Sequence, residues 1–356
     1  MAISRAATVA EFNAFDEVID ARSPGEFLDD HVPGAINLPV LNNEERARVG
    51  TLYKQVSSFE AKKVGAAWVS RNIAYHLETY FSDKPKSYRP LIYCWRGGSR
   101  SGSLTHVLQK IGFGAQQLEG GYKAYRRAVV AELGTLPVSF DFLVVSGPTG
   151  SGKSRLLQAL TVQGGQVLDL EGLAAHRGSL LGALPDQAQP NQKRFESEIW
   201  SRLKQFDPAQ PVFVESESKK IGTLRVPEAL MVRMRESPCL RLEVPQQARI
   251  ALLTEEYTHF LQTPALLQTQ LGHLTKMRGH ETIAHWQSLI QTQNWSELVG
   301  DLLNIHYDPA YFKSLNKNYA PNNRDRTYAL EDISPSGFSA LAAQILVDSG
   351  HSPSTS

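Results

Sequence analysis

Residues 140–154 have the sequence FDFLVVSGPTGSGKS. Its end matches the phosphate-binding pattern G-x-x-x-x-G-K-S, and the apolar run before the match predicts the strand that this motif follows. Glycines let the backbone wrap around phosphate oxygens, Lys153 can reach the outer phosphates, and Ser154 could bind Mg²⁺. We therefore predict a diphosphate-binding loop made of Gly147, Thr149, Gly150, Ser151, Gly152, Lys153 and Ser154.

The residues that surround this loop predict an α/β domain over residues 136–350. Strands are predicted at DFLVVSG, QVLDL, PVFVES and CLRLEV, each followed by a helix or a loop, as a parallel sheet requires. From about residue 248 apolar residues recur at helical spacing, which predicts a helical C-terminal part. No guanine or adenine signature is recognisable, so the motif indicates a polyphosphate without naming it.

Several charged side chains near the predicted strand ends are candidates for contacts to substrate or RNA. A solvated strand end or loop is an equally ordinary place for each of them, but a set of cations around a phosphate site could bind a diphosphate or an RNA backbone. We assign no metal ligands among them. The candidates are Asp169, Glu171, His176, Arg177, Glu215, Lys219 and Arg225.

The stretch CWRGGSRS, residues 94–101, predicts a second anion site. Cys94 follows the apolar run PLIY and precedes a predicted helix, so the N–H groups of the turn converge at a helix N-terminus. That field favours the thiolate, the form of cysteine that attacks. We predict that Cys94 is a nucleophile, although a lone cysteine is commonly a small buried apolar residue. The anion-binding loop would comprise Trp95, Arg96, Gly97, Gly98, Ser99 and Arg100.

The segments on either side of this loop, residues 18–39 and 112–127, closely resemble the rhodanese family. The resemblance implies a rhodanese-like α/β domain over residues 1–135, whose loop cysteine holds sulfur or selenium. It assigns framework roles to Asp20, Arg22, Glu26, His31, Pro33, Gly34 and Asn37. Two features depart from plain rhodaneses. The insertion at residues 41–89 is additional, and the C-x5-R loop has the length found in related phosphatases, which leaves phosphatase or arsenate-reductase chemistry open.

Composition adds limits to these expectations. The 356 residues are enough for two domains, and two cysteines are too few for a disulfide framework. A formal net charge of +1 means that any RNA-binding surface must be a local patch. No run approaches the roughly 18 apolar residues of a membrane span, and no signal peptide is evident, so we predict a cytoplasmic protein without a membrane partner.

Taken together, the motifs resemble the bacterial tRNA 2-selenouridine synthase family. They are CWRGGSRS, GPTGSGKS, DLEGLAAHRGSLLG, ESESKKIG and YDPAY, in this order. The resemblance implies a transferase that replaces the sulfur of 2-thiouridine by selenium at the wobble position of certain tRNAs. The implied partners are a tRNA that bears wobble 2-thiouridine and the enzyme that supplies selenophosphate. No tightly bound cofactor is implied.

By the same resemblance the reaction has two stages. The P-loop domain binds geranyl diphosphate, and the thiouridine sulfur attacks it with release of pyrophosphate. Cys94 then takes selenium from selenophosphate as a perselenide, which displaces geranylthiol. The isoprenoid chain needs an apolar pocket, which we place at Leu173, Leu180, Leu181 and Leu184.

Two other functions are compatible with the motifs. In an ATP-dependent tRNA sulfurtransferase, the P-loop would activate a nucleobase with ATP and Cys94 would supply sulfur. In a P-loop kinase or switch, the rhodanese module would be regulatory rather than catalytic. Both alternatives require a nucleotide at Gly147–Ser154.

Overall fold

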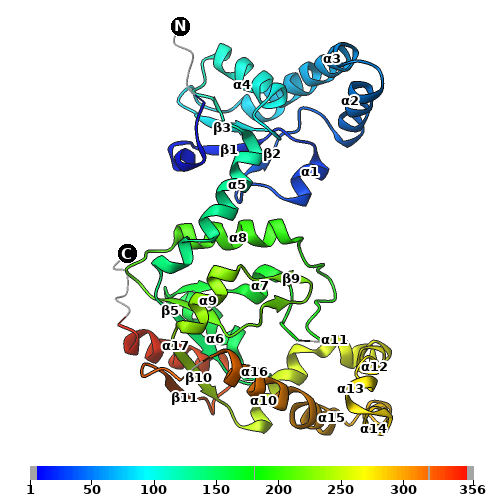
Figure 1. The fold of residues 1–356 in the computed structure, drawn as a ribbon, viewed down its shortest axis with the longest axis vertical. Helices are drawn as coiled ribbons and strands as arrows, with labels where there is room; N and C mark the ends of the chain where they lie inside the picture. The colour runs from blue at the N-terminus through cyan, green and yellow to red at the C-terminus, as the bar shows by residue number, and fades with distance from the viewer. Residues whose placement is uncertain (1–5, 180, 320, 351–356) are drawn as a thin grey trace. The chain divides into compact units, whose positions relative to one another are not determined.

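The computed structural model describes residues 6–179, 181–319 and 321–350. The chain divides into two compact units, each with its own parallel sheet (Figure 1). The first unit extends to Glu132 and also takes in Asn191–Ser201, and the second contains Leu133–Pro190 and resumes at Arg202. The return of Asn191–Ser201 to the first unit was not predicted, because an amphipathic helix does not reveal in its sequence which domain it covers.

The first unit is built on a four-stranded sheet with the order β2-β1-β3-β4. Its parallel strands are β1 (Glu17–Asp20), β2 (Ile36–Asn37), β3 (Pro90–Tyr93) and β4 (Gln116–Gln117). The accompanying helices are α1 (Pro24–Asp29), α4 (Ser99–Ile111) and α5 (Gly121–Leu133), with a 3-10 turn, η1, at Val9–Ala14. Every residue of β3 is buried, as expected for a central parallel strand.

Framework residues of this unit are joined by buried polar contacts. Arg22 donates to the carboxylate of Asp20 at 2.7 Å and to the carbonyl oxygen of Asp30 at 2.6 Å. The amide of Asn37 donates to the carbonyl oxygens of Asp20 and Arg22, both at 2.9 Å. These contacts join β1 to the segments that follow it, because each buried polar group needs a partner.

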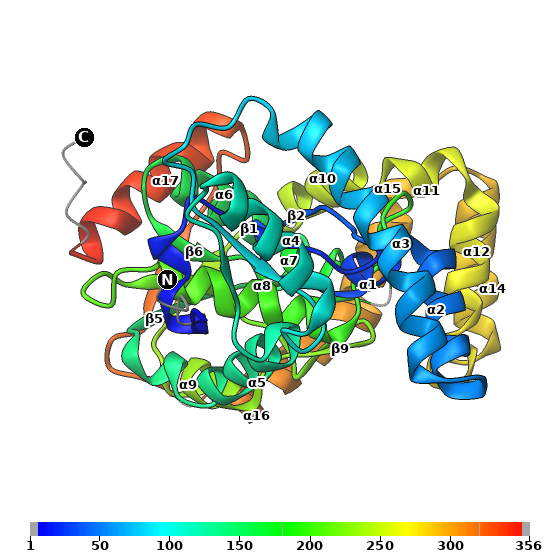
Figure 2. The same cartoon turned by 90° about the horizontal axis from the view of Figure 1, so that it is seen from above.

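The insertion at residues 41–89 folds as a helical hairpin. α2 (Asn43–Gln55) and α3 (Ser58–His76) lie side by side, and a π-helical turn, η2 (Leu77–Phe81), follows α3 (Figure 2). Asn42 caps α2 by accepting from the N–H of Glu45, and Ser57 caps α3 by accepting from the N–H of Glu60. These caps fix where the two helices start.

The second unit has a five-stranded parallel sheet with the order β11-β10-β5-β7-β6. Its strands are β5 (Phe142–Ser146), β6 (Gln166–Leu168), β7 (Val212–Glu215), β10 (Cys239–Glu243) and β11 (Arg326–Ala329). A small antiparallel hairpin is formed by β8 (Lys220–Ile221) and β9 (Leu224–Arg225). The α/β fold with parallel sheets is thus confirmed. β11 lies within the part predicted to be helical, and its sequence gives little signal because this short edge strand is mostly exposed.

Helices surround this sheet and extend beyond it. Those that alternate with the strands are α6 (Lys153–Val162), α7 (Leu170–Ala174), α9 (Glu228–Glu236) and α17 (Pro335–Asp348), with a 3-10 turn, η3, at Leu136–Ser139. α8 (Gln192–Gln205) belongs to the first unit as far as Ser201, and its last turn belongs to the second. The helical part contains α10 (Gln246–Glu256), α11 (Thr258–Gln262), α12 (Pro264–Gly272), α13 (Thr275–Arg278), α14 (His280–Gln291), α15 (Trp295–Asp301), the π-helical turn η4 (Leu302–Tyr307) and α16 (Asp308–Asn318). It has its own core around the fully buried Trp286.

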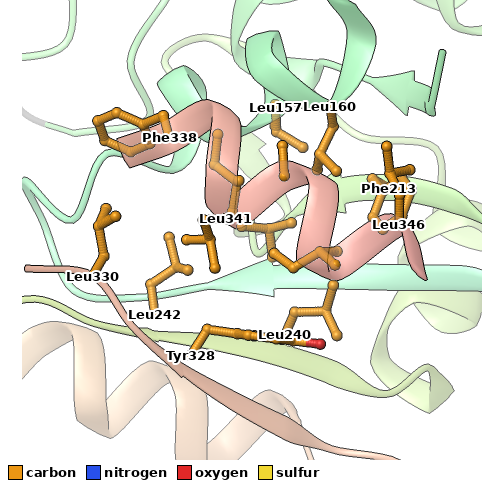
Figure 3. Close-up of a cluster of buried hydrophobic side chains, with 14 of the residues drawn as sticks. Leu157, Leu160, Phe213, Leu240, Leu242, Tyr328, Leu330, Phe338, Leu341 and Leu346 are labelled. Carbon is orange, nitrogen blue, oxygen red and sulfur yellow. The ribbon is translucent and has the colours of Figure 1, made fainter. Parts of the chain in front are cut away.

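The core of the sheet forms where α17 packs against α6. Figure 3 shows Phe338, Leu341 and Leu346 of α17 close to side chains of α6 and of the sheet. Phe338 also lies close to the P-loop, since a Cβ atom at Gly152 would be 2.4 Å from its ring. The hydrophobic core therefore fixes the position of the phosphate-binding loop.

No helix within residues 6–179, 181–319 and 321–350 has the length and apolar character needed to cross a membrane.

Candidate active sites

Cys94 opens the loop that joins β3 to α4. Gly97 in this loop has a φ of +66°, and a Cβ atom there would lie 2.7 Å from the carbonyl oxygen of Leu118. A side chain would clash at this distance, so the turn requires glycine. The loop therefore passes close to the neighbouring chain segment before it enters α4 at Ser99.

Gly121, the first residue of α5, holds the same loop from another side. A Cβ atom at Gly121 would lie 2.2 Å from the carbonyl oxygen of Cys94. The next two N–H groups of α5 donate to the loop, from Tyr122 to the Cys94 oxygen at 2.8 Å and from Lys123 to the Trp95 oxygen at 3.1 Å. The start of α5 thus fixes the backbone on which the thiol sits.

The thiol of Cys94 is buried, and its closest polar partner is Ser101. The hydroxyl of Ser101 donates to Sγ at 3.0 Å and accepts from the amide of Gln117 at 2.8 Å. The carbonyl oxygen of Gly98 is a second acceptor for this hydroxyl at 3.4 Å, so Sγ is the nearer of its two acceptors. The loop predicted from the sequence ends at Arg100 and so leaves out Ser101, the next residue of the same motif.

The two loop arginines have different environments. Arg100 forms a two-pronged ion pair with Glu26 of α1, with nitrogen–oxygen distances of 2.6 and 3.2 Å. Burial opposes ionisation of Glu26, but the hydrogen bond and charge of Arg100 hold its pKa below the ordinary value. Arg96 is exposed. Arg100 therefore ties the loop to α1, while Arg96 is accessible to an anion from solvent.

A basic concavity with an aromatic platform lies beside this loop. Trp95 stacks on Tyr122 with ring centroids 5.2 Å apart. The guanidinium of Arg22 lies 4.0 Å from the centroid of the Tyr122 ring. The concavity is also lined by Arg96, Gly120, Lys123, Arg126, Arg127 and Lys193. Aromatic faces and cations in this combination are suited to single-stranded nucleic acid.

The phosphate-binding loop of the second unit lies between β5 and α6, at the carboxyl edge of the sheet. Gly150 and Gly152 have φ values of +80° and +75°. The ammonium of Lys153 donates to the carbonyl oxygen of Gly147 at 2.9 Å, and the hydroxyl of Ser154 donates to Glu171 at 3.1 Å. β5 is flanked by β10 and β7, so the loop occupies the place where parallel α/β sheets bind ligands.

Three glutamates lie beside the loop. Glu215 at the end of β7 is fully buried and accepts from the N–H of Glu171 at 2.6 Å. Burial, followed by the nearby carboxylates, raises its pKa well above the ordinary value. Burial and the neighbouring Glu171 raise the pKa of Glu217 to about 8, and burial also raises the pKa of Glu171. The raised pKa favours the protonated form of Glu217 and so lessens the negative charge beside the loop. Sequence reasoning missed Glu217 although ESESKKIG contains it.

The remaining charged candidates have separate places. Arg177 reaches the phosphate cavity, where it donates to the carbonyl oxygen of Glu256 at 3.0 Å and lies over the ring of Tyr257. Asp169 caps α7, and His176 accepts from the N–H of Gly178. Asp169, His176, Lys219 and Arg225 are not among the residues that line the cavity. Lys219 pairs with Glu228 at 3.0 Å, and Arg225 is exposed on β9.

A second, apolar pocket adjoins the phosphate cavity. Thr149, Leu253, Tyr257 and Tyr307 line both spaces. The other residues of the apolar pocket are Leu181, Thr254, Phe260, Leu261, Leu267, Trp295, Leu298, Val299, Leu302 and Leu303. They come almost entirely from α10, α11, α12, α15 and η4. The helical part of the domain therefore builds an apolar extension of the phosphate site.

This pocket differs from the one expected from the sequence. Leu181 lines it, whereas Leu173 and Leu184 do not, and Leu180 lies outside the described residues. The Leu-rich stretch offers apolar side chains, but such a stretch more often belongs to a hydrophobic core. Most of the pocket is made instead by residues between Leu253 and Tyr307, which no local pattern connects to the P-loop.

Both units match known protein families. Residues 6–128 match the rhodanese-like domain family, and residues 140–279 match the tRNA 2-selenouridine synthase AAA domain family. The chain is 34% identical to a tRNA 2-selenouridine synthase from Nitrosomonas europaea over 80% of this chain and 72% of the relative. It is 30% identical to one from Bdellovibrio bacteriovorus over 85% and 89% of the two chains, and 31% identical to one from Aeromonas salmonicida over 87% and 88%.

The chain belongs to the tRNA 2-selenouridine synthase family. Membership confirms the resemblance drawn from the motifs, and it makes the protein an enzyme of the transferase class. The two families match the two units described above, with the cysteine loop in the first match and the P-loop in the second.

Gly121→Ala is predicted to deform the cysteine loop, with Gly112→Ala as its control. Both glycines have positive φ values, but a Cβ atom meets the Cys94 oxygen at Gly121 and open space at Gly112. We expect Gly121→Ala to lower the free energy of unfolding by at least about 1 kcal/mol more than Gly112→Ala. It should also change the rate at which Cys94 is alkylated. Equal losses of stability and unchanged alkylation would show that the contact is unimportant.

Glu217→Gln is predicted to stabilise the second unit increasingly as the pH rises. The carboxyl of Glu217 ionises near its ordinary pKa of 4.5 when unfolded but near 8 when folded, so the wild type loses stability between these values. Glutamine cannot ionise and removes that loss. Urea unfolding at about pH 5 and about pH 8 measures the difference. An equal effect of the substitution at both values would contradict the assigned protonation.

Proposed function

We propose that the protein converts wobble 2-thiouridine in tRNA to 2-selenouridine through an S-geranylated intermediate. The observation that carries the proposal is the apolar pocket that adjoins the P-loop, because geranyl diphosphate is a diphosphate joined to an apolar chain. Family membership supports tRNA as the substrate. The basic concavity beside Cys94 supports RNA binding at the first unit.

The P-loop domain performs the first step. The diphosphate binds to the N–H groups of Gly147–Ser154 and to Lys153, and the isoprenoid chain enters the apolar pocket past Tyr257 and Tyr307. The thiouridine sulfur attacks the allylic carbon, the carbon–oxygen bond breaks, and pyrophosphate leaves with the electron pair. Lys153 and the start of α6 stabilise the charge that develops on the leaving oxygens.

A magnesium ion would fit beside this loop, although the reaction as proposed does not depend on it. The hydroxyl of Ser154 and the carboxylate of Glu171 are 3.1 Å apart, and both are oxygen ligands of the kind that Mg²⁺ prefers. When bound, the ion would neutralise diphosphate charge. Ser154 and Glu171 are the residues that would hold it.

Selenium enters at the cysteine loop in the second step. Cys94 attacks selenophosphate, whose oxygens bind to the loop N–H groups and to Arg96, and the phosphorus–selenium bond breaks. Selenium then adds to C2 of the S-geranylated uridine, the C2–sulfur bond breaks, and geranylthiol leaves. Geranylation helps here because a thiol is a better leaving group than the sulfur of a thiocarbonyl.

The apolar pocket also argues against the ATP-dependent alternatives. An adenine or guanine base has a polar edge that needs hydrogen-bond donors and acceptors. The pocket beside the P-loop is lined chiefly by leucine and aromatic side chains. This lining favours a hydrocarbon chain over a nucleobase.

The direct test supplies 2-thiouridine tRNA and geranyl diphosphate, with and without selenophosphate, and identifies the nucleosides by mass spectrometry. We expect a geranylated nucleoside that becomes 2-selenouridine only when selenophosphate is present. Val299→Phe fills the apolar pocket and should raise the KM for geranyl diphosphate about tenfold or more. It should leave conversion of pre-geranylated tRNA unchanged.

Val347→Phe is the matched control, since Val347 is 78% exposed on α17. An unaltered KM for geranyl diphosphate in Val299→Phe would mean that the isoprenoid chain binds outside this pocket. Tight ATP binding without either nucleoside product would favour a sulfurtransferase that uses ATP or a regulated kinase.

A further inference from the structure

The electron count of the selenium transfer restricts what Cys94 can do. Selenium in selenophosphate is bound to phosphorus(V) and is at the oxidation level of selenide, and selenium in 2-selenouridine is at the same level. A perselenide on Cys94 contains a sulfur–selenium bond and lies two electrons above that level. Forming it from selenophosphate would expel phosphorus as phosphite, and discharging it would need a reductant.

From the loop geometry we propose that Cys94 attacks the phosphorus of selenophosphate and not its selenium. The Sγ–phosphorus bond forms, the phosphorus–selenium bond breaks, and selenium leaves with the electron pair as hydrogen selenide. Water then attacks the phosphocysteine, phosphate leaves, and the thiolate returns. No oxidant or reductant is required. The inference rests on the proposed function, whose second step it specifies.

Ser101 is the residue that makes the second half of this cycle feasible. When water attacks phosphocysteine, sulfur is the leaving group and develops negative charge. The Ser101 hydroxyl accepts from Gln117 and lies 3.0 Å from Sγ and 3.4 Å from the carbonyl oxygen of Gly98, so Sγ is its nearer acceptor and can receive its proton as that charge develops. Hydrogen bonds to a charged atom are stronger than those between neutral groups. In a perselenide, by contrast, the charge lies on selenium and not on Sγ.

The loop itself has the size and charge for a phosphoryl group. Cys94 and Arg100 have the C-x5-R spacing that phosphatases share, and the loop leads into the N-terminus of α4. Arg100 has five N–H donors and directs two nitrogens at Glu26, which holds the guanidinium in place and leaves further donors for phosphate oxygens. Sulfurtransferases commonly have a loop one residue shorter, so this loop suits a four-coordinate phosphorus centre.

The experiment uses the full chain with selenophosphate and no RNA. After acid quenching, the peptide that contains Cys94 is analysed by mass spectrometry. We expect a phosphorylated peptide without the selenium isotope pattern. In Ser101→Ala the phosphocysteine should accumulate, and steady-state phosphate release should fall about 10- to 100-fold, because the leaving sulfur loses its hydrogen bond.

Ser103→Ala is the control, because Ser103 is on the same helix and its hydroxyl donates only to the carbonyl oxygen of Ser99. It should leave phosphate release unchanged. A peptide that carries selenium but no phosphorus would overturn the inference. Unchanged phosphate release and no phosphocysteine in a folded Ser101→Ala variant would do the same.

A second measurement separates this inference from the proposed function. Wild-type protein is given pre-geranylated tRNA and selenophosphate without any added thiol. The phosphocysteine route predicts many turnovers, whereas the perselenide route stops after one for lack of a reductant. If phosphocysteine forms but no 2-selenouridine appears, the proposed function fails while the inference holds. If 2-selenouridine forms through a Cys94 perselenide, the inference fails alone.

Discussion

Both sites depend on one constraint, a buried parallel strand that ends where a helix begins. Cys94 lies between the end of β3 and the start of α4, and the P-loop lies between the end of β5 and the start of α6. In each case the loop must turn sharply, so glycines with positive φ occupy the turn, and a turn of this kind at a helix N-terminus suits an anion. Residues outside the loop fix it in place. Gly121 touches the cysteine loop, and Phe338 lies against Gly152.

The two sites differ in what surrounds that common device. At the first, a thiol with a directed hydroxyl partner lies next to a basic, aromatic concavity. At the second, protonatable glutamates and an apolar pocket adjoin the phosphate site. Under the proposed function, the first arrangement would provide a nucleophile and the second a cavity for a diphosphate with a hydrocarbon tail. The two sites therefore share a strand-to-helix turn of the kind that binds anions, and their surroundings distinguish the chemistry proposed for each.

Local patterns predicted the parts of this structure that are local. The strand before the P-loop and the strand before Cys94 were recognisable because each is a short apolar run followed by a glycine-containing loop. The apolar pocket was not, because Val299 and Leu303 reach Thr149 only through tertiary packing. Similarly, β11 was not recognisable, because it is a short exposed edge strand that follows a long helical segment. The importance of Ser101 was not recognisable either, because it depends on the short distance from its hydroxyl to Sγ of Cys94. Such features follow from three-dimensional contacts and have no periodic signature.

The most direct test of this division of labour compares Lys153→Ala with Cys94→Ala. Each variant is given 2-thiouridine tRNA with both small substrates and, separately, pre-geranylated tRNA with selenophosphate. The account predicts that Cys94→Ala stops at the geranylated nucleoside, and that Lys153→Ala makes 2-selenouridine only from the pre-geranylated tRNA. If Lys153→Ala geranylates normally, or if Cys94→Ala still forms 2-selenouridine, the assignment of the two steps to the two domains is wrong.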